Sequence, residues 1–318
     1  MNPIRVAVVG AGAFGRNHIR VVSECGSAQL AAVVDIQAER ASAAAAQFGC
    51  PAFAHHADLK GQVDAAIVAV PTSAHAEVAC DLMQAGIDVL VEKPIAGDLA
   101  SGERLVATAE RSDRVLMVGH LERFNPGVMA LKKILRLPLF FEIHRMSLFS
   151  PRSLDVDVVL DLMIHDLDIV LDLVGIAPSE VRAAGISVLS SKVDIANVRL
   201  AFPTGCIANL TASRVSTERI RKLRLFQPSQ YISLDYSRQE GAVFSVQDGQ
   251  KIDFQMLAVE KKEPLRLEVD HFLDCVATRQ APAVSGRDGL RALASALDIL
   301  GKIEEHSQLV ASQLKSLA

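Results

Sequence analysis

The first 120 residues alternate between short apolar runs and segments with the hydrophobic periodicity of a helix. The apolar runs are continuous, which is typical of strands whose two sheet faces are both covered by helices. A series of strand, helix and strand predicts a parallel, doubly wound sheet. The expected strands lie at 4–9, 30–34, 65–70, 89–91 and 115–118, and the expected helices at 14–24, 38–48, 73–85 and 98–112.

The pattern changes after about residue 123. Short strand candidates now follow one another, separated by turn residues such as Phe202-Pro203-Thr204-Gly205, and this arrangement predicts a mostly antiparallel sheet. The expected helices lie at 126–135, 157–174, 265–278 and 286–304, and the expected strands at 139–146, 179–188, 194–202, 206–213, 220–226, 230–236 and 241–247.

The length of 318 residues favours two domains. We expect a doubly wound α/β domain over residues 1–122 and an α+β domain with a mostly antiparallel, open sheet over residues 123–318.

Composition excludes several classes of protein. The formal charge of −4, the absence of Trp and the lack of a basic run argue against nucleic acid as a partner. No apolar stretch reaches the roughly 18 residues of a membrane span, so no membrane partner is expected. The five cysteines are scattered without a CxxC pair, which predicts reduced thiols in a cytoplasmic protein and neither a disulfide framework nor a zinc site.

A glycine-rich loop follows the first expected strand and opens the first expected helix. Residues 10–15 read Gly-Ala-Gly-Ala-Phe-Gly, and GxGxxG in this context indicates a site for dinucleotide phosphates. Gly10 permits the tight turn, Gly12 lets the backbone approach a pyrophosphate, and Gly15 lets helix and strand pack closely. The helix N-terminus, with Ala13 and Phe14, supplies free N–H groups and partial positive charge to a Rossmann-type cofactor site.

Asp35 ends the second expected strand, twenty residues after Gly15. A carboxylate at this position accepts hydrogen bonds from the ribose hydroxyls of NAD and repels the additional phosphate of NADP, so NAD is the expected cofactor. The alternatives are a solvated Asp that terminates a strand and a methyltransferase, in which a glycine loop also precedes an acidic residue.

Glu92-Lys93-Pro94 follows the expected strand 89–91. Ligands of a doubly wound sheet gather outside the carboxyl ends of its strands, which puts Lys93 where a substrate would meet a nicotinamide. Pro94 restricts the backbone of Lys93 to extended conformations. Taken alone, the tripeptide would be a solvated Glu-Lys pair before a turn.

The expected helix 157–174 carries polar residues three or four positions apart, which places them on one stripe. Asp161 and His165 are close enough to hydrogen-bond or to share a ligand, whereas Asp168 and Asp172 are expected to face solvent. Asp166 falls on the apolar side of the helix, where a carboxylate needs a partner that the sequence does not identify.

In their order along the chain, these motifs resemble those of the glucose–fructose oxidoreductase and inositol dehydrogenase family. The matching segments are the glycine loop, Val70-Pro71-Thr72 with His75, Glu92-Lys93-Pro94, and Gly119-His120-Leu121-Glu122-Arg123-Phe124-Asn125-Pro126. The resemblance implies that Val70, Pro71, Thr72 and His75 contact NAD, and that Glu92 lies near the nicotinamide ribose. It also implies a cis bond before Pro94.

The same resemblance implies an oxidoreductase that acts on a sugar hydroxyl. The catalytic set would be Lys93 with Asp161 and His165, which match the family's Asp-x-x-x-His pair. We expect His165 to take the hydroxyl proton, Lys93 to stabilise the alkoxide and Asp161 to orient the substrate or His165. No metal is expected. The second domain would bind substrate and assemble a homo-oligomer, either a dimer or a tetramer.

Family members often carry glycines just before this pair, whereas here residues 155–160 read Asp-Val-Asp-Val-Val-Leu. In this segment the chain looks like the UDP-N-acetylglucosamine 3-dehydrogenase branch. That branch makes a 3-keto sugar nucleotide, which a separate aminotransferase converts to a 3-amino sugar for lipid A. A diphosphate substrate calls for Arg or Lys near the site; Arg152 and Arg214 are the candidates, although either could instead pair with an acidic neighbour.

Two other functions stay open at this point. One is an NAD-dependent dehydrogenase of a free sugar or of a cyclitol such as inositol. The other is an NAD-binding regulator without activity, which the presence of Lys93, Asp161 and His165 together disfavours.

Overall fold

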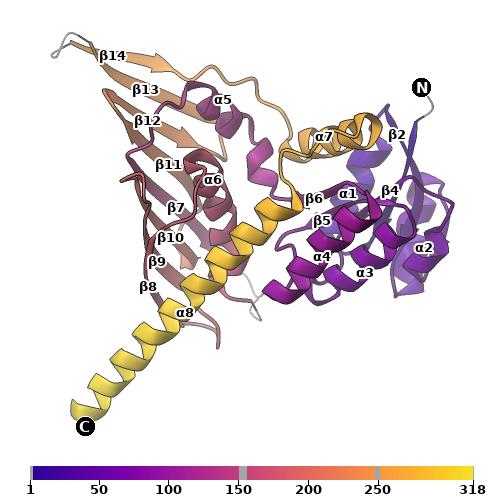
Figure 1. Cartoon of the computed structure of the whole chain (residues 1–318), viewed down its shortest axis with the longest axis horizontal. Coiled ribbons are helices and arrows are strands. Elements are labelled where there is room, and N and C mark those ends of the chain that lie inside the picture. Colours follow the sequence, from indigo (N-terminus) through magenta and orange to yellow (C-terminus); the bar gives the residue numbers. More distant parts are fainter. Residues whose placement is uncertain (1–2, 150–155, 248–250, 318) are drawn as a thin grey trace. The chain divides into compact units, whose positions relative to one another are not determined.

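The computed structural model describes residues 3–149, 156–247 and 251–317 (Figure 1). The chain forms two compact units, of which the first combines Met1–Leu121 with Glu263–Leu293 and the second combines Glu122–Lys262 with Ala294–Ala318. This division differs from the expected domains 1–122 and 123–318, because Glu263–Leu293 returns to the first unit. There, helix α7 (Pro264–Thr278) packs against helix α1 (Ala13–Ser23).

The first unit contains a six-stranded parallel sheet in the order β3-β2-β1-β4-β5-β6. The predicted doubly wound sheet is therefore confirmed. Its central strands are buried on both faces, as in β4, where all four residues are inaccessible. The two-residue β3 was not expected, because so short a strand has no periodicity. The strands are β1 Ile4–Val9, β2 Ala28–Val34, β3 Ala52–Phe53, β4 Ala65–Val68, β5 Asp88–Glu92 and β6 Leu116–Gly119; the other helices are α2 Ala38–Phe48, α3 Thr72–Gln84 and α4 Leu99–Ser112.

The second unit contains an eight-stranded sheet in the order β14-β13-β12-β11-β7-β10-β9-β8. Only the β7–β10 pair is parallel, so the prediction of a mostly antiparallel sheet is confirmed. Strand β14 was not expected. The strands are β7 Phe140–Leu148, β8 Glu180–Ile186, β9 Ile195–Ala201, β10 Ile207–Ser216, β11 Ile220–Gln227, β12 Gln230–Asp235, β13 Glu240–Gln247 and β14 Lys251–Met256.

Helices cover one face of this sheet. Alternate residues of β9 are buried, as is usual for a strand with one covered face. Helices α5 (Pro126–Ile134) and α6 (Ile164–Val174) lie over the strands in Figure 1. Helix α8 (Gly286–Leu317) reaches strand β8, where a Cβ added to Gly185 would lie 2.9 Å from the Ile303 side chain.

The expected helix 157–174 is interrupted by a π-helical turn, Val159–Met163, that precedes α6. The N–H of Ile164 donates to the carbonyl of Val159, five residues back, instead of the usual four. Such wide turns are rare and frequently lie at functional sites. Asp161 lies in this turn, and His165 lies in the first turn of α6.

The partner of Asp166 is Arg145, which extends from strand β7. Two parallel hydrogen bonds of 2.8 and 2.9 Å join the guanidinium to the carboxylate, and a third, of 3.0 Å, joins it to Glu122. Arg145 is 1% exposed and its guanidinium lies over the ring of Tyr236. Burial opposes its charge, but the carboxylates of Asp166 and Glu122 raise the pKa of Arg145 above its ordinary value. This network fixes α6 against the sheet.

Asp168 was expected to face solvent, and that expectation was wrong. Its carboxylate is buried and lies 3.5 Å from the guanidinium of Arg123, which also binds Asp172 at 2.9 Å. The reason is that the polar stripe of α6 is covered by Arg123, which belongs to the segment leading into α5.

Composition predicted reduced thiols and no membrane span. All five cysteines are free thiols. Across the described ranges, every helix is too short or too polar to cross a bilayer.

We predict that Asp166→Ala lowers the free energy of unfolding by about 3–5 kcal/mol, since it leaves the Arg145 charge buried without its bidentate partner. Urea unfolding followed by circular dichroism measures the loss. The double variant R145M/D166L removes this pair but leaves Glu122 without its Arg145 partner, so it should recover only part of the loss. Glu305→Ala, which breaks an exposed pair with Lys302, is the control and should leave the midpoint unchanged. A D166A midpoint equal to that of E305A would contradict the prediction.

Candidate functional site

The glycine loop connects β1 to α1 at the carboxyl edge of the parallel sheet. Gly10 has a φ of +98°, and a Cβ there would lie 2.5 Å from the carbonyl oxygen of Ala69. A Cβ on Gly15 would lie 1.7 Å from the carbonyl oxygen of Gly10. Neither position accepts a side chain, in agreement with the tight turn and the close packing predicted for them.

The loop fits the phosphates of a dinucleotide at Gly12. Among the residues that the structure describes, none comes within 4 Å of the position that a Gly12 Cβ would take, so the backbone is open to a ligand. The first intrahelical bond of α1 runs from the N–H of Arg16 to Gly12. The N–H groups of Ala13 and Phe14 therefore precede the helical ladder and are suited to bind an anion.

Asp35 lies beside this loop at the end of β2. Its Oδ2 accepts the N–H of Ala11 at 2.9 Å and its Oδ1 accepts the N–H of Gln37 at 2.9 Å. A carboxylate has about four acceptor positions, so two ribose hydroxyls can still be bound. Arg40, which the sequence did not indicate, lies 3.6 Å from Oδ2. Asp35 therefore has acceptor positions left for a ribose, and its charge faces the Arg40 guanidinium. Its contact with a cofactor stays a prediction.

His75 joins two loops at the same edge of the sheet. Its Nδ1 lies 2.9 Å from the carbonyl oxygen of Pro94 and its Nε2 lies 3.0 Å from that of Val70. Burial lowers the pKa of His75, which favours a neutral ring that donates to one of these carbonyls. The link ties the Val70-Pro71-Thr72 segment to the turn after β5. Contacts of these four residues with a cofactor stay a prediction.

Lys93 follows Glu92, the last residue of β5, and the Lys93–Pro94 bond is cis, as expected. The Oε2 of Glu92 accepts the N–H of Lys93 at 3.2 Å, and its Oε1 lies 2.7 Å from the Nε2 of His18. A Cβ on Gly119 would lie 3.1 Å from the same carboxylate. Glu92 is thus a buried anchor for the Lys93 backbone.

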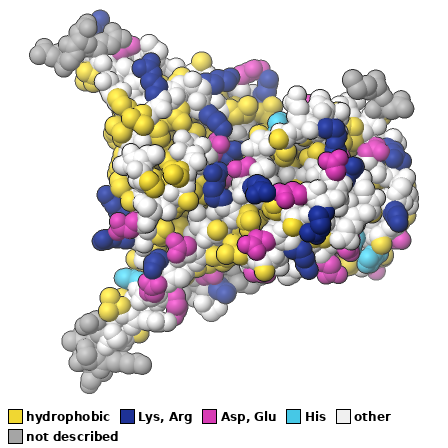
Figure 2. Space-filling view, viewed as in Figure 1, with side chains coloured by type: hydrophobic (Ala, Val, Ile, Leu, Met, Phe, Trp, Pro, Cys, Tyr) yellow, Lys and Arg dark blue, Asp and Glu magenta, His cyan; other side chains and the backbone are white. Residues whose placement is uncertain are grey.

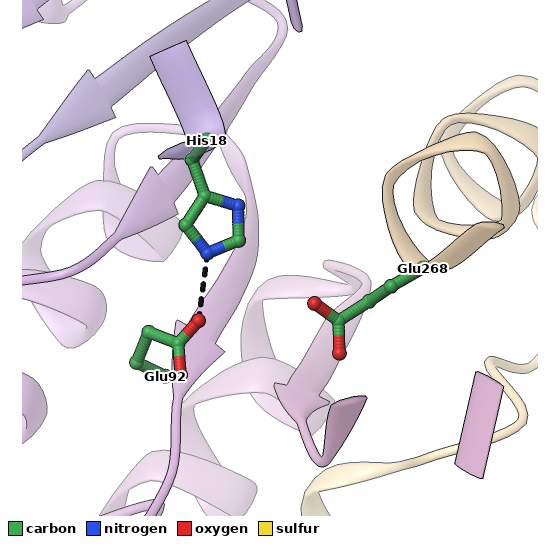
Figure 3. Close-up of side chains that lie close together, drawn as sticks. All are labelled: His18, Glu92 and Glu268. Atoms are coloured by element: carbon green, nitrogen blue, oxygen red, sulfur yellow. Dashed lines mark hydrogen bonds and ion pairs between the residues drawn. The ribbon is translucent and has the colours of Figure 1, made fainter. Parts of the chain in front are cut away.

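A third ionisable residue, Glu268 on α7, faces Glu92 and His18 (Figure 3). The three side chains could together hold a metal ion. The sequence suggested no metal and neither His18 nor Glu268. One signal was available for Glu268, because it lies on the apolar face of α7 with Leu265 and Phe272.

Asp161 and His165 belong to the second unit, and both are partly exposed. The start of their segment is anchored to the loop before β9, where Asp157 accepts the N–H of Val193 at 2.9 Å and Val158 donates to its carbonyl. Lys93 lies in the first unit. The catalytic roles of the three residues stay predictions.

Arg214 takes the alternative role that the sequence left open, because it pairs with an acidic neighbour. Its Nε donates to Asp194 at 2.8 Å, and it also binds Ser190 and the carbonyl of Val156. Burial works against the charge of Asp194, but hydrogen bonds from Leu189 and Arg214 lower its pKa. Contact of Arg214 with substrate stays a prediction. Arg152 lies outside the described residues.

The strand order of the sheet, the glycine loop and the acidic residue that ends β2 define a dinucleotide-binding protein of the Rossmann class. Residues 4–120 match the model of the GFO/IDH/MocA oxidoreductase family with an NAD-binding Rossmann fold, and residues 144–226 match the C-terminal domain of that family. The chain belongs to the GFO/IDH/MocA family of NAD-binding oxidoreductases. The resemblance seen in the motifs is thereby confirmed.

Known relatives and solved structures are similar to this protein over nearly its whole chain. UDP-N-acetylglucosamine 3-dehydrogenase of Acidithiobacillus ferrooxidans is 36% identical, over 96% of this chain and 99% of that protein. A solved structure of that enzyme superposes with a TM-score of 0.91 and the same coverage. Inositol 2-dehydrogenase of Rhizobium meliloti is 26% identical over 96% of this chain and 98% of its own length. An Agrobacterium radiobacter oxidoreductase, solved with NAD+, L-tartaric acid and magnesium, is 18% identical with a TM-score of 0.86 over 95% and 97% of the two chains, and shows the shared fold.

We predict that Asp35→Ala weakens NAD binding and reduces the preference of the protein for NAD over NADP. The substitution removes an acceptor for the ribose hydroxyls and frees Arg40 to bind the additional phosphate of NADP. Dissociation constants for both cofactors, from fluorescence titration, measure the effect. The double variant D35A/R40A should bind NAD as weakly as D35A does, but it should lack the increased relative affinity for NADP. An unchanged NAD affinity and an unchanged preference in D35A would contradict the assignment.

Proposed function

We propose that this protein uses NAD to oxidise the 3-hydroxyl of UDP-N-acetylglucosamine to a 3-keto sugar nucleotide. The observation that carries this proposal is the 36% identity with UDP-N-acetylglucosamine 3-dehydrogenase across 96% of this chain and 99% of that protein. The residues expected for hydride chemistry are present as well. Lys93 follows a parallel strand at the edge where ligands of this fold bind, and Asp161 and His165 lie one turn apart.

Oxidation of a hydroxyl needs a proton acceptor, a group that stabilises negative charge on oxygen, and a hydride acceptor. NAD supplies the last of these when bound. In the proposal His165 takes the proton, since an imidazole titrates near neutrality. The Lys93 ammonium stabilises the alkoxide, and Asp161 orients His165 or the sugar. In the proposal the cofactor is held by the loop at Gly12, the N-terminus of α1 and Asp35.

A second candidate is oxidation of a free sugar or cyclitol, which the 26% identity with an inositol 2-dehydrogenase favours. A regulator without activity is the third, and the presence of Lys93, Asp161 and His165 argues against it. In the main proposal, a separate aminotransferase converts the ketone to a 3-amino sugar for lipid A. We place this reaction in the cytoplasm, in keeping with five free thiols.

We further propose that the protein is a homo-oligomer, a dimer or a tetramer, assembled through the uncovered face of the second sheet. Neighbouring strands carry a row of aromatic rings with centroids 4.8–5.8 Å apart: Phe140, Phe226, Tyr231, Phe244 and Phe254. Phe254 is 55% exposed and Met256 is 61% exposed. Figure 2 shows hydrophobic side chains gathered in this unit. Exposed apolar side chains gathered in this way are typical of a contact with another protein, here a second copy of this chain.

We predict that Lys93→Ala and His165→Ala each reduce turnover by about 10²-fold or more, because each removes a group that acts on the hydroxyl proton or the alkoxide. NAD affinity should change little. Steady-state NADH formation and NAD titration measure the two quantities, and Lys302→Ala and His55→Ala serve as matched controls outside the site. If either variant kept near-full turnover at saturating substrate, the role of that residue would be wrong.

We predict that the purified protein reduces NAD with UDP-N-acetylglucosamine and fails to do so with N-acetylglucosamine, glucose or inositol. Absorbance at the NADH band follows the reaction, with an aminotransferase and an amino donor added to draw off the ketone. Arg152→Ala should raise the KM for the sugar nucleotide more than the KM for NAD, since a guanidinium suits a diphosphate. Activity on inositol or a free sugar alone would favour the second candidate.

A further inference from the structure

We propose that Glu268 is a positioning residue for Lys93, in the form of a buried, uncharged carboxylic acid that closes the surroundings of Glu92. This inference rests on the proposed role of Lys93. It assigns a function to the C-terminal segment that returns to the first unit.

Three parts of the chain contribute to this cluster. His18 comes from α1, Glu92 from the end of β5 and Glu268 from α7, and one donor atom of each lies within 4.8 Å of the others. His18 and Glu268 are 0% exposed, and Glu92 is 7% exposed. In Figure 3 the carboxyl group of Glu268 points toward the His18–Glu92 pair. Among the described residues, neither oxygen of Glu268 has a hydrogen-bond partner.

The surrounding charges determine whether Glu268 is protonated. The titratable groups that face it are His18 from α1 and Glu92 from β5, and these two are joined to each other at 2.7 Å. A second carboxylate charge beside this pair would be buried and repelled by Glu92. Burial first, and then the charge of Glu92, raise the pKa of Glu268 well above its ordinary value. A protonated, neutral Glu268 is the form that agrees with this burial and this neighbouring charge.

The geometry favours a proton over a metal ion. Two ligands of one tetrahedral zinc ion, each bound at about 2.0–2.1 Å, lie roughly 3.3 Å apart. The Nε2 of His18 and the Oε1 of Glu92 are closer, at 2.7 Å, which is the length of a charge-assisted hydrogen bond. A metal ion would have to separate this pair.

The cluster acts on Lys93 through Glu92. The other oxygen of Glu92 accepts the Lys93 N–H at 3.2 Å, and Gly119 packs so closely that an added Cβ would lie 3.1 Å from the carboxylate. Glu92 is therefore enclosed by His18, Gly119 and Glu268. Without a polar group at position 268, the Glu92 carboxylate faces an apolar surface on that side and shifts, and the Lys93 backbone loses its fixed acceptor.

The first experiment compares Glu268→Gln with Glu268→Leu in the full-length protein. Gln reproduces the size and polarity of a neutral acid, so kcat should stay within about twofold of the wild type. Leu removes the polar group, and kcat should fall about tenfold or more, with smaller changes in KM and in NAD affinity. Asp274→Leu, an exposed position on the same helix, is the control.

The second experiment measures Tm against pH and needs no activity. A carboxyl group whose pKa is raised by folding binds more protons in the folded than in the unfolded state. Its contribution to stability is complete below the unfolded pKa and is lost as pH rises through the folded pKa. E268Q does not titrate, so its Tm should exceed that of the wild type by a margin that grows as the pH rises above the pKa of an unfolded glutamate, about 4.3.

Three results would overturn the proposal: parallel Tm profiles for E268Q and the wild type, loss of kcat in E268Q equal to that in E268L, or full kcat in E268L. Stoichiometric zinc in the wild type and its loss in E268Q, measured by plasma mass spectrometry, would replace it with a metal site. Failure of the proposed function is a separate outcome. If Lys93 has no catalytic role, K93A keeps its turnover, but the Tm profiles still report whether Glu268 is charged.

Discussion

A charged group that leaves water must find a partner inside the protein, and this requirement determines how each unit holds its candidate site residues. In the second unit the bidentate pair of Arg145 and Asp166 fixes α6 against β7, and α6 carries His165 directly after the π-helical turn that carries Asp161. In the first unit the short contact between His18 and Glu92 fixes the carboxylate that accepts the Lys93 N–H. In both units a residue proposed for chemistry is adjacent in the sequence to a buried carboxylate that a hydrogen bond holds in place.

This arrangement explains why neighbouring residues differ so much in accessibility. Asp161 and His165 are partly exposed and available to a ligand, whereas Asp166 and Asp168, on the same short segment, are buried with arginines. The π-helical turn adds one residue to the helical repeat between the anchored start at Asp157 and the paired Asp166. Wide helical turns of this kind are frequent in functional segments. Here the packed residues on both sides hold the unusual geometry in place.

The parts of the structure that could be predicted from the sequence depend on local chemistry. Gly10 needs its positive φ because of the adjoining turn, and Asp35 follows the glycine loop at a fixed distance along one β–α–β unit, so both could be read from the sequence. The parallel and antiparallel sheets could be predicted for the same reason, from continuous apolar runs and from turn residues. Arg145, the partner of Asp166, could not, because the partner of a buried charge is chosen by tertiary packing between segments 21 residues apart. The exposure expected for Asp168 was wrong because helical periodicity alone cannot show that Arg123 covers the polar stripe.

The largest difference between sequence and structure has the same origin. The return of Glu263–Leu293 to the first unit brings Glu268 to a cluster whose other members precede residue 93, and no local pattern records this long-range contact. A carboxylate on the apolar face of α7 was nevertheless a visible conflict between periodicity and polarity. Such conflicts mark places where burial is retained for a purpose other than stability, since an apolar residue of similar size would pack at lower cost. Asp166 showed the same conflict in the sequence and proved to be the anchor of the second unit. Glu268 stands in the corresponding position in the first, next to the buried carboxylate of Glu92 that accepts the Lys93 N–H.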